Sequence, residues 1–405
     1  MSAAPGGGEG AVPASTGLDA DPEAEAMALI ELLADEVGPR RPTSRNEGLA
    51  ALLLRDRLRR RGLGAEVERF QGYASFGYPF AVIQGAALLP ELLPARRRIG
   101  RSAIALASGA ALASEGSLRV TPLSRLLSRN RSGNVVATVE PTGPAQRTLC
   151  LMAHMDSSRS GLIFDPRFVS MLGAWISLQS VAGLAQAVGE PLLGGSRRGR
   201  RLLRVARAVL AAGLLLLIER EIRGEDVPGA NDNASGCAVA AVLAAEAAAA
   251  PLGSTRLVLC LTGCEESGTL GSQAFLDAHD TDGWLFLNVD NVGGPGSVRY
   301  LRREGVLAKW DADAGLIAAA ERVAEDDPGL RLLPEDSPAG LTYDSSPVLA
   351  RGGRALTLSV QDGSIPNLHW PTDTVENVDP DGVSRTLRAA RGIVREVDAG
   401  TADLR

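Results

Sequence analysis

The sequence predicts an α/β fold in which helices sandwich a largely parallel central sheet. Short, continuously apolar segments such as Arg256–Thr262 and Trp284–Val289 alternate with helical segments such as the alanine-rich Gly236–Ala250. Strands that are apolar throughout are typical of a sheet buried on both faces, and their alternation with helices is typical of parallel α/β architecture. The 405 residues, 45% of them apolar and 22% charged, have the composition of a globular protein.

The N-terminal elements are predicted from apolar spacing and from end signals. A helix is expected from Pro22 to Val37, because apolar residues recur at helical spacing until a Gly-Pro pair follows. A second helix is expected from Asn46, as its N-cap, to the glycine at 62. Residues 65–70 then have the pattern of a strand.

The second part of the chain is expected to alternate regularly between the two element types. Strands are predicted at residues 134–139, 149–153, 256–262, 284–289 and 355–360, and helices at 236–250, from 270, at 312–324 and at 380–397.

Two apolar segments interrupt this pattern, and both are predicted to be helical hairpins with arginine-rich turns. They span residues 80–115 and 168–225. We expect a disordered tail at 1–21, one α/β domain assembled from 22–79, 116–167 and 226–400, and the two hairpins as insertions in it.

Charge and cysteine content exclude several functional classes. The net charge of −6 gives no indication of a nucleic-acid partner. The four cysteines, Cys150, Cys237, Cys260 and Cys264, form no CxxC pair and are predicted to be buried thiols. The sequence has three histidines, so any histidine-based site must draw on His154, His279 and His369.

Polar residues at the ends of predicted strands are the candidates for a functional site, because ligands bind at the carboxyl ends of strands in α/β sheets. His154 ends one such strand, and Asp156 follows two residues later, where it can orient the imidazole. Asp232 lies in a Gly-Ala-Asn-Asp-Asn-Ala-Ser-Gly segment before the alanine-rich helix, a pattern that by itself also fits a turn with an N-cap.

Carboxylates and a second histidine follow the later strands. Glu265 and Glu266 come directly after a buried strand, where two adjacent acids are costly unless a cation or a proton compensates them. Asp290 interrupts the next apolar strand, and His369 lies in a loop after the strand near 360. Together, two histidines and three carboxylates, without a thiolate, are donors suited to two zinc or similar divalent ions.

The sequence resembles the co-catalytic zinc aminopeptidase family, peptidase family M28, which includes aminopeptidase Y and bacterial leucyl aminopeptidases. The stretches AHMDS, GANDNASG, TGCEESGTLGS, LNVDNVG and HWPTDTVENVD occur in the family's order. The resemblance implies that Asp232 bridges two metals, that His154 and Asp290 complete one site and Glu266 and His369 the other, and that Glu265 is the base and Asp156 the orienting residue.

The resemblance implies an exopeptidase that releases amino acids from peptides with a free amino terminus. A Glu base and a metal-bridging water would carry the hydrolysis. Other zinc-dependent amide chemistry on the same fold stays open, namely that of a carboxypeptidase, a deacylase or a glutaminyl cyclase. A non-catalytic receptor-like scaffold is the rival from a different class, although neither the ligands nor the base are missing.

The hairpins make the chain similar to a bacterial subgroup of the family that carries membrane-spanning helices inside the catalytic domain. We expect membrane contact through residues 80–115 and 168–218. The positive-inside rule then puts the arginine-rich turns in the cytoplasm and the catalytic domain on the extracytoplasmic side. The alternative is a soluble helical cap or dimer surface on a cytoplasmic protein.

Overall fold

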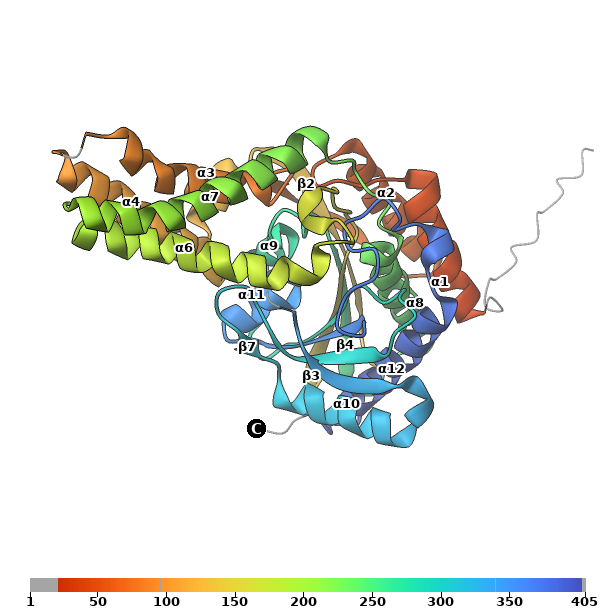
Figure 1. Ribbon diagram of the computed structural model, residues 1–405. Coiled ribbons are helices and arrows are strands. Elements are labelled where there is room, and N and C mark those ends of the chain that lie inside the picture. The colour runs from red at the N-terminus through yellow and green to blue at the C-terminus, as the bar shows by residue number, and fades with distance from the viewer. Residues whose placement is uncertain (1–20, 95, 339, 403–405) are drawn as a thin grey trace, which may run out of the picture.

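The computed structural model describes residues 21–402 except Ala95 and Ala339. Figure 1 shows a body of sheet and helices from which a bundle of long helices projects to one side. The tail predicted at residues 1–21 lies outside the described residues, apart from Asp21. The α/β fold class with two inserted helical hairpins is confirmed.

The described strands form one nine-stranded sheet in the order β1-β2-β4-β3-β5-β9-β6-β7, with β8 paired to β6. Their bounds are β1 Glu66–Gly72, β2 Asn130–Val139, β3 Arg147–His154, β4 Thr255–Thr262, β5 Leu285–Val289, β6 Val298–Glu304, β7 Trp310–Asp311, β8 Leu332–Asp336 and β9 Arg354–Val360.

The sheet is parallel at its centre and mostly antiparallel at its edges. Strands β4, β3, β5 and β9 are parallel, whereas β1, β2 and β6 run antiparallel to their neighbours on this path. The link between β5 and β6, residues 290–297, is too short for the crossover that a parallel strand requires. The prediction of a largely parallel sheet therefore holds for the four central strands, which are those that carry the site.

Helices cover both faces of the sheet (Figure 1). On one face, α1 Pro22–Glu31, α2 Arg45–Arg60, α8 Gly236–Ala249, α10 Ala314–Asp326 and α12 Pro380–Asp398 bury residues with Leu149 and Leu151 of β3. On the other face, α9 Leu270–Ala278 and α11 Ser345–Ala350 pack with Cys150 and Met152. Alternate residues of β3 thus enter two hydrophobic cores, as strand geometry requires.

Two local predictions can be compared directly with the structure. All four cysteines are buried free thiols, as expected. The N-cap of α2 is Ser44, whose side chain accepts a hydrogen bond from the Glu47 amide, and not Asn46. The side-chain amide of Asn46 instead donates to the carbonyl oxygens of Val37 and Pro39. It therefore connects the start of α2 to the segment that precedes it and does not cap a helix.

The two predicted hairpins lie side by side and form one bundle, which we call the helical arm. It consists of α3 Gly77–Leu88, α4 Arg98–Ser117, α6 Leu172–Leu193 and α7 Arg197–Arg223. Each hairpin packs against the other, through α3 with α7 and α4 with α6. The turns that carry the arginines lie at the end of the arm farthest from the sheet (Figure 1).

One segment of the arm, Val169–Leu193, is long and apolar enough to cross a membrane, and it is the only such helix among the described residues. The most apolar 18-residue window of this segment has a mean hydropathy of 1.3, and 28% of that window is buried.

Candidate metal centre

The predicted site residues converge at the carboxyl ends of the central parallel strands. His154 ends β3, Glu265 and Glu266 follow β4, and Asp290 follows β5 directly. Because β3 pairs in parallel with both β4 and β5, these ends meet at one edge of the sheet. The turn before α8 and the loop after β9 add the remaining predicted residues, Asp232 and His369.

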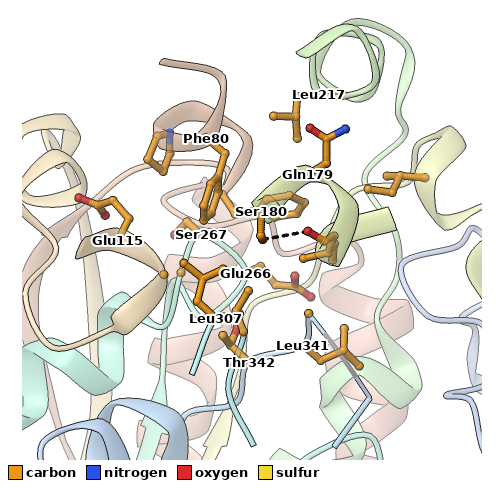
Figure 2. A pocket seen from close by; sticks show the side chains of 18 of the residues that line it. Phe80, Glu115, Gln179, Ser180, Leu217, Glu266, Ser267, Leu307, Leu341 and Thr342 are labelled. Atoms are coloured by element: carbon orange, nitrogen blue, oxygen red, sulfur yellow. Dashed lines mark hydrogen bonds between the residues drawn. The ribbon is translucent and has the colours of Figure 1, made fainter. Parts of the chain in front are cut away.

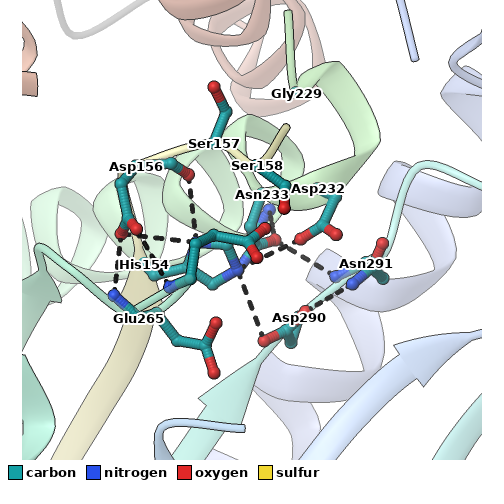
Figure 3. Close-up of polar contacts among 12 residues, drawn as sticks. His154, Asp156, Ser157, Ser158, Gly229, Asp232, Asn233, Glu265, Asp290 and Asn291 are labelled. Carbon is teal, nitrogen blue, oxygen red and sulfur yellow. Dashed lines mark hydrogen bonds and ion pairs between the residues drawn. The ribbon is translucent and has the colours of Figure 1, made fainter. Parts of the chain in front are cut away.

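The carboxylate of Asp232 lies between the two histidines. Its Oδ1 is 3.1 Å from Nε2 of His154, and its Oδ2 is 3.2 Å from Nε2 of His369. The His154 Nε2 atom is also 3.7 Å from Asp290 Oδ2, and the His369 Nε2 atom is 3.1 Å from Glu266 Oε1. Two groups of nitrogen and oxygen donors therefore share Asp232, and Figure 3 shows the His154 group.

Asp156 positions the backbone that carries the two adjacent glutamates. Its carboxylate accepts hydrogen bonds from the backbone N–H of Glu265 at 3.1 Å and of Glu266 at 3.0 Å. The Nδ1 atom of His154 lies 3.1 Å from the main-chain carbonyl oxygen of Asp156 and 3.7 Å from its carboxylate. Asp156 thus contacts both the histidine and the loop after β4 (Figure 3).

Burial and crowding shift the pKa values of these groups strongly. Burial raises the pKa of Glu265 well above its usual value, and the nearby charge of Glu266 adds to this while that of His154 opposes it. Burial likewise raises the pKa of Asp290 to about 8. Burial by itself would lower the pKa of His369, but Glu266 and Asp232 outweigh it and raise the pKa to about 9. Buried acids and histidines that hold protons this tightly are typical of a site built to bind cations.

The unpartnered atoms of the cluster fit a metal ion. Oε1 of Glu265, Oε1 of Glu266 and Nδ1 of His369 are buried and have no hydrogen-bond partner among the described residues. Candidate ligand atoms of His154, Asp232 and Glu266 lie within 4.8 Å of one another. Imidazole and carboxylate donors suit zinc and similar divalent ions, so the residues present are chemically compatible with the metal that the motifs predict.

The backbone near the cluster is held in sparsely populated conformations. Cys264, Asn291 and His369 have φ values of 56°, 57° and 50°, in the left-handed region that non-glycine residues rarely adopt. Such conformations persist where the surrounding structure enforces them, and they concentrate at functional sites.

Arg40, which the sequence analysis did not single out, ties together the two loops that carry His154 and Asp232. Its buried guanidinium donates to the carbonyl oxygens of Met155 at 2.8 Å and of Gly229 at 2.8 Å, and to three further carbonyl oxygens. An arginine directly after a Gly-Pro pair carries no sequence signal for this role, because its partners are remote in the chain.

We expect Arg40→Met to lower the free energy of unfolding by about 3 kcal/mol, because it leaves several buried carbonyl oxygens unpaired. Arg41→Met is the matched control, since the Arg41 side chain is 32% exposed and 3.9 Å from Asp226. The control should change stability by less than about 0.5 kcal/mol. Urea unfolding followed by tryptophan fluorescence compares the two, and equal stabilities would show that the Arg40 network contributes little.

Asp373 is a second residue that sequence reasoning passed over. Its Oδ1 accepts the Asn231 amide at 2.7 Å, and its Oδ2 accepts the Asp232 amide at 3.0 Å. The carboxylate therefore fixes the backbone from which Asp232 projects. A signal was available here, because Asp373 belongs to the same HWPTDTVENVD stretch as His369.

The fold and the cluster define the class of zinc-exopeptidase-like α/β proteins. Residues 218–394 match the family model of peptidase family M28, the same family that the motifs resemble, and this match supports a metallopeptidase. No curated protein sequence matches the chain significantly.

Solved structures similar to this chain include zinc aminopeptidases. BSAP, a zinc aminopeptidase from Bacillus subtilis, is 16% identical, with a TM-score of 0.56 over 93% of this chain and 94% of that one. The aminopeptidase from Aneurinibacillus sp. strain AM-1 is 15% identical, with a TM-score of 0.56 over 93% of each chain. A glutaminyl cyclase from Bacteroides thetaiotaomicron is 12% identical, with a TM-score of 0.55 over 92% and 97%. At such identities the likeness concerns the fold alone.

Proposed function

We propose that this protein removes amino-terminal residues from peptides by hydrolysis at a site for two zinc ions. The observation that supports this most directly is the placement of Asp232, whose two oxygens each face a different histidine. His154 and Asp290 would hold one ion, and Glu266 and His369 the other, with Asp232 shared. Zinc bound in this way polarises the scissile carbonyl and lowers the pKa of a bound water.

Glu265 is the proposed general base. It is buried beside the ligand cluster, and within the described part of the chain its Oε1 has no hydrogen-bond partner, so this oxygen is available to accept a proton. Its raised pKa favours uptake of a proton from the attacking water and later transfer of that proton to the leaving amine. Asp156 acts as a positioning residue, because it holds the backbone amides of Glu265 and Glu266.

We expect peptides with a free amino terminus to be cleaved at least about a hundredfold faster than their N-acetylated counterparts. An exopeptidase must recognise the terminal amine, and a site that binds a polar group discriminates strongly against an analogue that lacks it. Matched leucyl and N-acetyl-leucyl peptides, together with the zinc content per chain, test this. Equal cleavage of both would contradict the aminopeptidase assignment, and one tightly bound zinc with cyclisation of N-terminal glutamine would favour a glutaminyl cyclase instead.

We also propose that the helical arm enters a lipid bilayer. Its outer surface is apolar, with Val181, Val188 and Val205 between 57% and 69% exposed, whereas its interior holds buried charges. Glu190 pairs there with Arg101 at 2.7 Å and with Arg207 at 2.5 Å. Apolar outside and paired charges inside is the arrangement expected of helices surrounded by lipid.

The dimensions and charges of the arm agree with this proposal. Helices α4, α6 and α7 have 20, 22 and 27 residues, and about 20 residues are needed to cross a bilayer, whereas α3 has only 12. Among the described helices, α6 is the one that is also apolar enough. Exposed arginines cluster at the far turns, and they include Arg96, Arg97, Arg98, Arg197, Arg198 and Arg201. By the positive-inside rule these turns would lie in the cytoplasm and the catalytic body outside it.

We expect the protein to be recovered with membranes and released by detergent. Replacing Val181 and Val188 by lysine should shift it from the membrane pellet, because a charge in lipid costs about 2.5–3.5 kcal/mol. If the arm is instead a soluble cap, both positions face water, and the double variant should behave like the wild type. Recovery of the wild-type protein in the soluble fraction without detergent would contradict the proposal.

A further inference from the structure

A cavity of about 230 Å³ connects the metal cluster with the interior of the helical arm (Figure 2). At one end its walls include His154, Glu265 and His369. From there it continues between the helices, where Gly183 of α6 and Leu210 of α7 line it. The arm therefore forms part of the wall of the proposed active site as well as a projection from the body.

The part of the cavity within the arm is almost entirely apolar. Phe80 of α3, Leu112 of α4 and Trp175 of α6 contribute large apolar side chains to its walls. Most polar side chains there are hydrogen-bonded within the protein: the Ser180 hydroxyl donates to the Ile176 carbonyl oxygen at 2.9 Å, and the Gln179 side-chain amide donates to the Val209 carbonyl oxygen at 2.8 Å. The buried Oε1 of Gln84 is an exception, because it has no hydrogen-bond partner among the described residues. The cavity thus presents apolar surface to a ligand.

The cavity is large and elongated. A dry apolar cavity of about 150 Å³ suffices to bind benzene, and this one is larger. Its wall follows α6 from Leu172 to Gly183, which is roughly 16 Å at the helical rise of 1.5 Å per residue. An extended chain advances roughly 1.2 Å per bond, so this length accepts roughly thirteen methylenes. That is longer than any common apolar side chain.

We infer that this cavity binds a long, linear apolar chain on the acyl side of the scissile amide. The inference rests on the proposed exopeptidase function, in which the released end of the substrate enters the cavity and the rest of the peptide extends outward. In this arrangement the end group occupies the part of the cavity between the helices, and the continuing chain does not. Two substrate sources share this chemistry: an amino-terminal residue with a long alkyl side chain, and a fatty-acyl group in amide linkage.

A series of substrates with increasing chain length tests the inference. The first substrate series consists of 2-aminoalkanoyl p-nitroanilides with a free amine, and the second consists of N-alkanoyl amino acids. Each series has chains of four, eight and twelve carbons and is used below micelle-forming concentrations. Burial of one methylene corresponds to about a fourfold gain in affinity. The value of kcat/KM should therefore rise at least about tenfold between four and eight carbons in one of the two substrate series. Measurable turnover without a rise of kcat/KM in either substrate series would overturn the inference.

A variant that fills the cavity provides a second test. Ser180→Phe places a ring inside the cavity, whereas Val181→Phe, on the next residue of α6, places it on the outer surface, where Val181 is 63% exposed. Ser180→Phe should lower the ratio of kcat/KM for twelve-carbon over four-carbon substrates at least about tenfold. Val181→Phe should preserve that ratio. An unchanged ratio in Ser180→Phe would overturn the inference.

The outcomes separate this inference from the proposed function. Cleavage of short aminoacyl substrates without a chain-length effect would refute the long apolar site and leave the aminopeptidase standing. A chain-length effect confined to the N-alkanoyl substrate series would support the apolar site and refute the aminopeptidase function. If neither substrate series reacts, calorimetric titration with dodecanoate and butyrate tests the inference. Dodecanoate should bind at least about tenfold more tightly than butyrate, and Ser180→Phe should remove this difference. Equal affinities for the two would overturn the inference.

Discussion

Glu265→Gln should lower kcat by at least about a hundredfold while leaving the zinc content of the protein unchanged. The substitution preserves the shape of the side chain but removes its ability to accept a proton, and general acid–base catalysis typically contributes 10²–10⁴-fold. The backbone N–H of residue 265 still donates to Asp156 in the variant, so the loop after β4 keeps its position. The proposed ligands are untouched.

The matched control for this variant is Glu376→Gln, which changes an exposed carboxylate in the loop after His369. It should retain the wild-type kcat. Zinc is measured in each purified variant by atomic emission, and kcat with a leucyl peptide. Near-normal turnover in Glu265→Gln would remove Glu265 from the mechanism. A loss of zinc in this variant would mean instead that Glu265 belongs to the ligand set.

Asp232→Ala should remove both zinc ions and abolish measurable turnover, whereas His369→Ala should affect mainly one ion. The reason is geometric, because the two oxygens of Asp232 face the two histidines separately. Loss of an outer-shell partner of a metal site costs about 10–100-fold in affinity or activity, and loss of a shared ligand should exceed that range.

Asp373→Asn provides the graded comparison. Asp373 accepts hydrogen bonds from the backbone amides of Asn231 and Asp232 and is not one of the proposed ligands. We therefore expect Asp373→Asn to lower zinc affinity or activity by about 10–100-fold. Equal zinc stoichiometry in Asp232→Ala and His369→Ala would contradict a shared ligand. A wild-type protein that binds a single zinc would contradict the dinuclear site altogether.

Zinc affinity should also rise with pH. The pKa of His369 is raised to about 9, mainly by Glu266 and Asp232 against the opposing effect of burial, so its imidazole is protonated at neutral pH before metal binds. Binding must then release a proton, and affinity falls as pH drops below that value. Competition with a zinc chelator at several pH values measures this dependence.

The strand ends of the catalytic body could be predicted from the sequence because the central strands are buried on both faces. The apolar runs of β3, β4 and β5 end near His154, Glu265 and Asp290, and this change from apolar to polar residues can be read from the sequence alone. The edge strand β1 was predicted at residues 65–70, but β6, β7 and β8 at the other side of the sheet were not. Strand β6 pairs with β9 on one side and with β7 and β8 on the other, but it contains three arginines among its seven residues, so its pattern is not that of a continuously apolar strand.

The sequence by itself determined the order of the motifs, the donor types of the metal centre and the existence of two helical hairpins. These features depend on local pattern or on residue chemistry. Only the tertiary structure decided that the carboxylate of Asp232 faces two histidines, that Arg40 joins the loops beside them, and that the hairpins pair into one arm with a cavity leading to Glu265. Such contacts join residues far apart in the chain, and their geometry arises from the packing of whole elements.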